Sequence, residues 1–233
     1  MSSGRYRRSL VALGALSVLA VSPAVASAVS ISEIGTVSDG RAPQCPESCS
    51  VITRTTALPT STNGDRNVYA APGNGTIVAW SLTLGAPTAD DRKALEKQLG
   101  RSRAQLTVLR RGKSVAATAI GASPLKYLDP YFGGEVTFAL PQTIAVRKGD
   151  VIGLSVSSWA PNLVQGYDAK TSWRASRPAG RCGGTTDERK ADYYVNTVLM
   201  TSKVGSFNCL YKSERLAFSA TFVPTPTRRA ASR

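Results

Sequence analysis

The chain has 233 residues and a mass of 24.6 kDa, which suits one all-β domain and is enough for a sizeable core. It carries 29 lysine and arginine residues against 15 acidic ones, and it contains no histidine. The missing histidine excludes Ser-His-Asp and Cys-His catalytic groups and zincin-type metal sites, and the 42% hydrophobic content argues against a disordered chain.

Residues 1–28 have the pattern of a signal peptide. Three arginines at positions 5 to 8 form a positively charged start, and an apolar run from Leu10 to Val21 follows. That run is too short to span a bilayer as a helix, and Ala26-Ser27-Ala28 is a small-residue cleavage site. We therefore expect this segment to be removed and the protein to be secreted, by either the general or the twin-arginine route.

Four cysteines fit an exported protein, because disulfides form and persist outside the cytoplasm. Residues 29–44 lack aromatic side chains and are expected to form a flexible leader before the first cysteine. Three pairings are possible, and the spacing favours disulfides Cys45–Cys49 and Cys182–Cys209. The later cysteines do not form a second close pair, which disfavours a zinc site. We expect no metal and no cofactor.

Apolar residues at alternate positions predict a series of short β-strands. The clearest covers Thr76 to Leu84, follows a Pro-Gly-Asn-Gly turn and places alternate residues from Val78 to Leu84 on one face. Pro141 is expected to end the strand over residues 135–140. In chain order, the other strands are expected over residues 50–55, 105–109, 114–120, 135–140, 151–157, 192–200 and 215–223.

One helix is expected, over residues 88–99. Thr88 can cap its N-terminus, and Asp91 lies three residues later in the capping-box position. Gly100 can end it. Its apolar residues form a single stripe, so we expect a surface helix packed over a sheet edge or the end of a barrel, rather than a partner-binding helix.

Eight or nine short strands, one helix and turn-rich spacers are typical of an antiparallel β-sandwich, here jelly-roll-like. We expect this domain over residues 45–223, followed by a polar, basic tail at 224–233. A connection over about 158–190 interrupts the strand rhythm. A loop of that length inside a compact domain is either functional or partly disordered.

Several short motifs together carry a family resemblance. They are the Cys45/Cys49 pair, Gly75-Thr76-Ile77-Val78-Ala79-Trp80, Leu106-Thr107-Val108-Leu109-Arg110, Lys148-Gly149-Asp150-Val151-Ile152-Gly153-Leu154 and Phe218-Ser219-Ala220-Thr221-Phe222. With them, residues 45–223 resemble the uncharacterised secreted β-sandwich proteins of high-GC Gram-positive bacteria. The resemblance implies a fold and a compartment. It implies no activity, so it transfers no functional residue.

Catalysis without histidine would have to rest on carboxylates, tyrosine, lysine or cysteine, and a glycosidase needs two carboxyl groups across a cleft. The candidates Asp129, Glu135, Asp168 and Asp192 are scattered along the chain. Residues 123–126 match Ser-x-x-Lys by letters, but their proline argues against the helical turn that this motif needs. We therefore expect no catalytic residue, and a carboxylate-dependent polysaccharide-active enzyme is the alternative.

Aromatic residues outside the clearest strands suggest a binding surface. Tyrosine and tryptophan rings can stack on the C–H faces of sugars. We expect the ligand to be bound by Tyr131, Trp159, Tyr167, Trp173 and Arg174. In the alternative interpretation, the two tryptophans plug the end of the sandwich or pin the long connection.

Basic residues recur at the turns and in the long connection. This distribution favours salt-dependent association with anionic polymers, whereas no motif points to specific nucleic-acid recognition. We expect a secreted, disulfide-stabilised, non-enzymatic domain that binds a glycan or an anionic polymer of the cell wall. The remaining alternative is a purely structural envelope protein. The basic clusters are Arg110/Arg111/Lys113, Arg147/Lys148, Arg174/Arg177/Arg181 and Arg189/Lys190.

Overall fold

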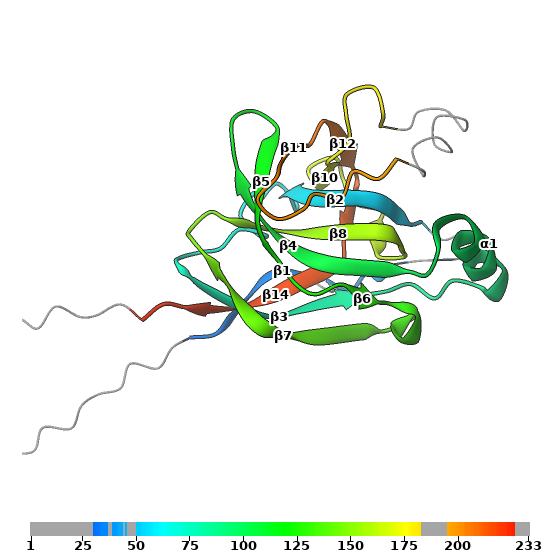
Figure 1. Ribbon diagram of the computed structural model, residues 1–233, viewed down its shortest axis with the longest axis horizontal. Helices are drawn as coiled ribbons and strands as arrows, with labels where there is room; N and C mark the ends of the chain where they lie inside the picture. The colour runs from blue at the N-terminus through cyan, green and yellow to red at the C-terminus, as the bar shows by residue number, and fades with distance from the viewer. Residues whose placement is uncertain (1–29, 37–38, 44, 46–49, 183–194, 227–233) are drawn as a thin grey trace, which may run out of the picture.

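A computed structural model of the chain shows two antiparallel sheets packed face to face, with one short α-helix at one end (Figure 1). This confirms the expected antiparallel β-sandwich. The predicted signal peptide, residues 1–28, lies outside the part of the chain that the structure describes. The described residues are 30–36, 39–43, 45, 50–182 and 195–226.

Strand order defines a smaller and a larger sheet. The smaller sheet runs β1 (Ser32–Thr36), β14 (Phe218–Pro224), β3 (Gly75–Thr83), β7 (Glu135–Val146). The larger sheet runs β11 (Val204–Ser206), β5 (Ala116–Ala122), β4 (Arg103–Arg111), β8 (Val151–Ala160), β2 (Ile52–Ser61), β10 (Ser172–Ala175), β12 (Cys209–Lys212), and β6 (Lys126–Tyr127) pairs with β4. The remaining elements are the β9–β13 ribbon (Leu163–Gln165 and Glu214–Leu216), α1 (Ala89–Leu99) and a 3-10 turn (Asp129–Tyr131).

The topology is that of a jelly roll. In the smaller sheet β1 neighbours β14 and β3 neighbours β7, while β2, β8, β4 and β5 lie side by side in the larger one. Numbered as eight strands in chain order, with β6 and the short strands between β8 and β14 left out, these rows read 1-8-3-6 and 2-7-4-5. That is the double Greek key of the fold, and the predicted jelly-roll-like arrangement is confirmed.

A β-bulge sets which residues of β3 enter the core. In the pairing with β14, Ile77 and Ala79 lie opposite the adjacent residues Phe222 and Thr221, so Val78 is an extra residue, and such a bulge moves the alternation by one residue. Val78, expected to face inward with Trp80, is therefore only half-buried, and Ile77 is fully buried in its place. Trp80 packs against Phe138 of β7 with ring centroids 5.0 Å apart.

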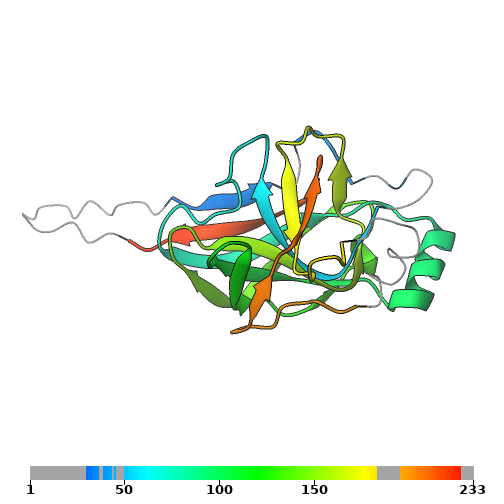
Figure 2. The same ribbon diagram turned by 90° about the horizontal axis from the view of Figure 1, so that it is seen from above.

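The larger sheet is covered on both faces, as the burial of nearly every residue of β8 shows. One face packs on the smaller sheet. Residues 195–208 cover the other, where Phe207 is fully buried and the Leu199 N–H donates to Thr56 Oγ1 at 2.8 Å. Strands β11 and β12 lie at opposite edges of this curled sheet, yet only Phe207 and Asn208 separate them in the chain. This short connection therefore ties the two edges together (Figures 1 and 2).

The predicted helix and its caps are confirmed. The Asp91 N–H donates to Thr88 Oγ1 at 3.1 Å, and the Thr88 hydroxyl donates to the Asp91 carboxylate at 2.8 Å. Gly100 follows the helix with φ of 79°, a conformation that glycine adopts without strain. Leu99 is the buried residue of α1, and it anchors the helix at the end of the sandwich.

Two expected boundaries are wrong. Within the expected flexible leader, Ser32–Thr36 forms β1, because it finds an antiparallel partner in β14. The expected stop at Pro141 is also absent, and β7 continues to Val146. It can do so because β7 is an edge strand and its ladder with β3 skips residues 140–143, so the missing N–H of proline leaves no partner unsatisfied.

The expected connection over 158–190 contains strands in its described part. It includes β9 and β10, and β10 pairs with β2 on one side and β12 on the other. These strands have three and four residues, which is too short for a clear alternation. The strand expected at 192–200 is not found over its described residues 195–200, where Thr197 makes one isolated bridge to Thr55.

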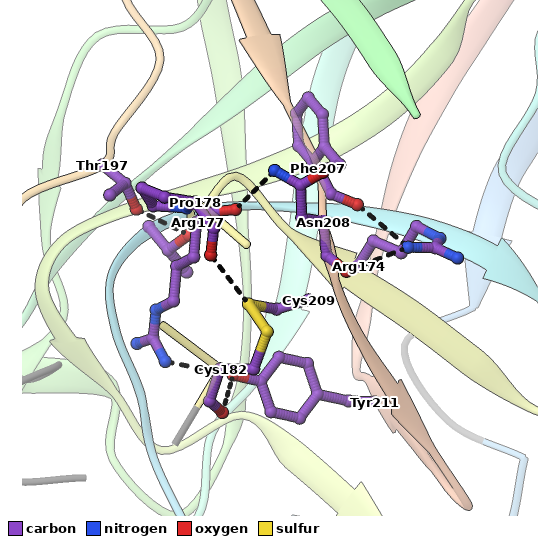
Figure 3. The surroundings of a disulfide bond; sticks show 10 residues. Arg174, Arg177, Pro178, Cys182, Thr197, Phe207, Asn208, Cys209 and Tyr211 are labelled. Atoms are coloured by element: carbon purple, nitrogen blue, oxygen red, sulfur yellow. Dashed lines mark hydrogen bonds between the residues drawn. A yellow bond between two sulfur atoms is a disulfide. The ribbon is translucent and has the colours of Figure 1, made fainter. Parts of the chain in front are cut away.

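The Cys182–Cys209 disulfide is confirmed and joins the chain after β10 to the start of β12 (Figure 3). Beside it, Arg177 Nη1 donates to the Tyr211 hydroxyl at 3.1 Å, which donates to the Cys182 carbonyl at 2.9 Å. Cys45 is also disulfide-bonded. Its predicted partner, Cys49, lies outside the described residues.

Candidate functional site

Trp159 is a core residue. None of its surface is exposed, its ring lies 5.4 Å from that of Phe132, and its Nε1–H donates to the Gly100 carbonyl at 2.9 Å. The indole therefore closes the space between β8 and the end of helix α1. It is not placed to stack on a ligand.

Trp173 is also buried, with 4% of its surface exposed. Its ring stacks on Tyr211 of β12 at 4.5 Å, and its Nε1–H donates to Glu214 Oε1 at 3.0 Å. The expected aromatic binding surface is thus wrong for both tryptophans, because each finds a partner ring and a hydrogen-bond acceptor inside the fold. The alternative interpretation, in which they fill and pin the structure, describes them correctly.

Glu214 makes stability depend on pH. Burial raises the pKa of its carboxyl above 4.5, against the opposing effect of hydrogen bonds from Trp173 and Gln165. A carboxyl whose pKa is raised by folding makes the protein less stable as the pH rises above the pKa that the group has in the unfolded chain. We expect Glu214→Gln, which keeps an acceptor for Trp173, to melt at a higher temperature than the parent at pH 7. The advantage should vanish below pH 4.5. An equal melting temperature at pH 7 would contradict this assignment.

Tyr167 belongs to a polar cluster that holds the N-terminal segment. Its hydroxyl donates to Asp39 Oδ2 at 2.7 Å and accepts from Arg215 Nε at 2.7 Å. Arg215 is 2% exposed and also donates to the Thr36 carbonyl at the end of β1. Burial and the hydrogen bond to Asp39 raise the pKa of Tyr167. These contacts fix β1 and leave Tyr167 engaged within the protein.

Arg174 lines a cavity of about 380 Å³, here called the arginine pocket. It reaches the pocket from β10, and its Nη1 donates to the carbonyls of Phe207 and Asn208 at 3.1 and 3.2 Å (Figure 3). The other walls come from β2, the β4–β5 hairpin and β12. Of the five expected ligand-binding residues, Arg174 alone lines this cavity. Tyr131 is exposed on a different part of the surface.

Two further arginines line the arginine pocket, Arg66 and Arg111. Partial burial lowers the pKa of Arg111, and the positive charge of Arg66 lowers it further. Neither side chain forms an ion pair or hydrogen bond with any residue that the structure describes. Asp65, next to Arg66 in sequence, accepts from the Asn67 N–H at 2.7 Å and does not line the pocket.

The two arginines of the basic turn at 110–113 have different surroundings, because neighbouring residues of strand β4 point to opposite faces. Arg110 Nε and Nη2 donate to the two carboxylate oxygens of Asp150 at 2.8 Å each, and Asp150 is 3% exposed. Arg111 points into the arginine pocket instead. Arg110 is therefore a structural cation, whereas Arg111 remains available to an anion.

Hydroxyl groups complete the arginine pocket. The Thr60 and Ser61 oxygens lie 2.8 and 3.0 Å from Ser172 Oγ, and Ser114 lies in the β4–β5 turn. The Thr60 and Ser61 hydroxyls donate to the carbonyls of Ser172 and Lys170 at 2.9 and 2.6 Å, so the donors left for phosphate, sulfate or carboxylate oxygens are chiefly the guanidinium groups. No carboxylate is found among the described lining residues. The pocket is thus suited to an anion with several oxygen atoms.

A second cavity, of about 480 Å³, lies beside the Cys182–Cys209 disulfide. Its described lining includes Ser176, Thr197 and Asn208 and contains no charged residue. Ser176 Oγ already accepts from the Thr56 N–H at 2.9 Å. This cavity offers no charge to a ligand, so the arginine pocket is the stronger candidate site.

The carboxylates that the alternative, a polysaccharide-active enzyme, would need do not occur among the described lining residues of either cavity. Asp129 binds Arg101 at 2.8 Å, and Asp168 Oδ1 accepts from the Lys170 N–H at 2.9 Å. Glu135 begins β7, and Asp192 lies outside the described residues. The described part of the chain also holds no group of three or more Cys, Asp and Glu side chains placed to bind a metal ion.

The arginine pocket was only partly foreseeable from the sequence. Arg111 and Arg174 belong to the basic clusters recognised in the sequence. Arg66 belongs to none of them, so it was not predicted as a binding residue. Comparison with known proteins adds nothing here, since no family model, curated protein or solved structure matches the chain. Over the described residues, no helix combines the length and apolar character needed to cross a bilayer.

Proposed function

We propose that this chain is a secreted, non-enzymatic domain that binds an anionic polymer of the cell envelope through the arginine pocket. One observation carries the proposal: three arginines line a single cavity whose described walls contain no acidic side chain. Guanidinium groups that lack a counter-ion repel each other, and a bound anion would relieve that repulsion.

Composition and compartment support the same proposal. Without residues 1–28, which carry three arginines and no acidic residue, the formal charge falls from +14 to +11, and this charge attracts polyanions over a distance set by ionic strength. The signal-peptide pattern and the disulfide favour an extracytoplasmic address, where envelope polymers occur. Arginine contacts to phosphate or carboxylate groups contribute about 1.5–3 kcal/mol each, so three of them suffice for useful affinity.

The test is neutralisation of the arginine pocket. Arg66→Gln combined with Arg111→Gln is expected to weaken binding of long-chain polyphosphate and of polygalacturonate at least about tenfold, which corresponds to about 1.4 kcal/mol. The affinity of the variant should also depend less steeply on salt concentration, because fewer counter-ions are released. Isothermal titration calorimetry over a range of sodium chloride concentrations measures both quantities.

A matched control separates the pocket from total charge. Lys93→Gln combined with Lys97→Gln removes the same charge from helix α1, whose two lysines are exposed. Figure 1 places α1 at the opposite end of the sandwich from the β4–β5 hairpin. We expect the control to keep most of its affinity. Equal losses in the two variants, or no binding of either polymer by the parent at low salt, would contradict the proposed function.

A further inference from the structure

Exposed apolar side chains concentrate in one short stretch of the surface. Leu125, Tyr127 and Tyr131 are 40%, 49% and 37% exposed, and they make up three of the eight large hydrophobic residues most exposed in the described chain. Leu125 directly precedes β6, Tyr127 ends β6 and Tyr131 ends the 3-10 turn that follows it. We call this stretch the 125–131 patch. Solvent-exposed apolar clusters of this kind mark interaction sites.

Cations flank the tyrosines of the 125–131 patch. The Arg101 guanidinium lies 4.2 Å from the centre of the Tyr127 ring and also donates to Asp129 Oδ2 at 2.8 Å. Tyr131 packs edge-on against Phe138, with centroids 5.3 Å apart, and the Lys126 ammonium lies 5.3 Å from the same Phe138 ring. Both tyrosines are therefore supported by neighbours while more than a third of their surface faces solvent.

A buried polar atom beside the patch lacks a partner. The Asp129 side chain is 6% exposed, and its Oδ1 has no hydrogen-bond partner within the described structure, although Oδ2 is bound by Arg101. Because that oxygen is itself shielded from solvent, it is not placed to accept from a sugar hydroxyl at the surface. The groups that this part of the surface offers to a ligand are therefore the tyrosine rings and the cations beside them.

Strand β4 connects the 125–131 patch to the arginine pocket. Tyr127 of β6 pairs with Arg103 at the start of β4, and Arg111 ends β4 at the pocket. At about 3.3 Å per residue, the two ends of the strand are about 26 Å apart. A chain that contacts both sites must therefore be a polymer.

We propose that Tyr127 and Tyr131 form a second contact for the polymer held by the arginine pocket, and that they stack on its sugar rings. This inference rests on the proposed function and makes its ligand class narrower: an anionic glycan chain, rather than a polyanion without rings. The arginines bind the acidic groups, and the tyrosines bind C–H faces of the rings. Two linked contacts raise the affinity for a long chain above that for a short one.

The experiment compares two polymer classes at two lengths. Tyr127→Ser combined with Tyr131→Ser is expected to weaken polygalacturonate binding about tenfold. Its affinity for trigalacturonate, which is too short to reach both sites, should stay unchanged. Binding of long-chain polyphosphate, which has no rings, should also stay unchanged. Met200→Ser, which removes another exposed apolar side chain, is the control and should match the parent. The Met200→Ser variant should melt at the parental temperature, and the tyrosine variant, which loses the contacts with Phe138 and Arg101, should melt below it but remain folded at the temperature of the binding assay.

The outcomes separate this inference from the proposed function. An unchanged polygalacturonate affinity in the tyrosine variant would overturn the second contact, and so would an equal loss for polyphosphate. In either case a loss in the Arg66→Gln, Arg111→Gln variant would leave the proposed function standing. If instead the arginine variant binds every probe as the parent does, the proposed function fails and the inference fails with it.

Discussion

Replacing Trp159 by alanine is expected to lower the free energy of unfolding by about 4 kcal/mol, the cost typical of emptying a buried aromatic site. The indole is fully buried, packs on Phe132 and donates to the Gly100 carbonyl. Its removal leaves a cavity and an unpaired carbonyl between β8 and the end of α1. Urea denaturation followed by circular dichroism measures the loss.

A phenylalanine at the same position divides this effect into its two parts. Trp159→Phe keeps a ring against Phe132 but gives up the hydrogen bond to the Gly100 carbonyl, so we expect a smaller loss of about 1–2 kcal/mol. If the alanine variant unfolded at the parental urea concentration and lost polygalacturonate affinity instead, Trp159 would be a ligand residue after all, as its position in the sequence first indicated.

The second large effect is expected from the Cys182–Cys209 disulfide. It closes a loop with a sequence separation of 27, and loop-closure entropy assigns such a crosslink about 3.5 kcal/mol. Replacing both cysteines with alanine should therefore lower the free energy of unfolding by about that amount. Alanine is chosen because Cys209 is fully buried and a serine hydroxyl would need a partner there. The measurement is again urea denaturation, made without reductant so that the other disulfide stays intact.

The same disulfide variant also tests how far the arginine pocket depends on β12. Leu210 of β12 lines the pocket, and the disulfide fixes the residue before it. We expect a folded but less stable protein that still binds polyphosphate below its melting temperature. A loss of stability under about 0.5 kcal/mol would show that the loop entropy is small in the unfolded chain.

Much of the fold could be predicted from residues whose surroundings are local. Thr88, Asp91 and Gly100 delimit the helix because capping depends on neighbours within one turn. The long strands β3, β4, β7 and β8 show up as runs of β-prone residues because both sheets bury one face against the other. The bulge at Val78 could not be foreseen, since it depends on the register with β14, a strand more than 130 residues later in the chain.

The candidate site was harder to predict, because its residues come from four distant parts of the chain. Arg66, Arg111 and Arg174 come to line one cavity only when β10 pairs with β2 in the larger sheet. The tryptophans failed as ligand residues for the same reason: the rings that cover them, Phe132 and Tyr211, are supplied by separate segments. Aromatic residues outside a clear strand pattern can be buried by a partner that sequence order does not reveal.

By itself, the sequence determined the class of the protein. The absence of histidine removed the commonest catalytic groups, alternation along the strands predicted the jelly-roll-like sandwich, and the spacing of the later cysteines indicated their disulfide. The positive charge predicted anionic partners but not which arginines would be left without a counter-ion. Only the tertiary structure decided that: it paired Arg110 with Asp150 and left Arg111 beside Arg66, because adjacent residues of one strand face opposite sides.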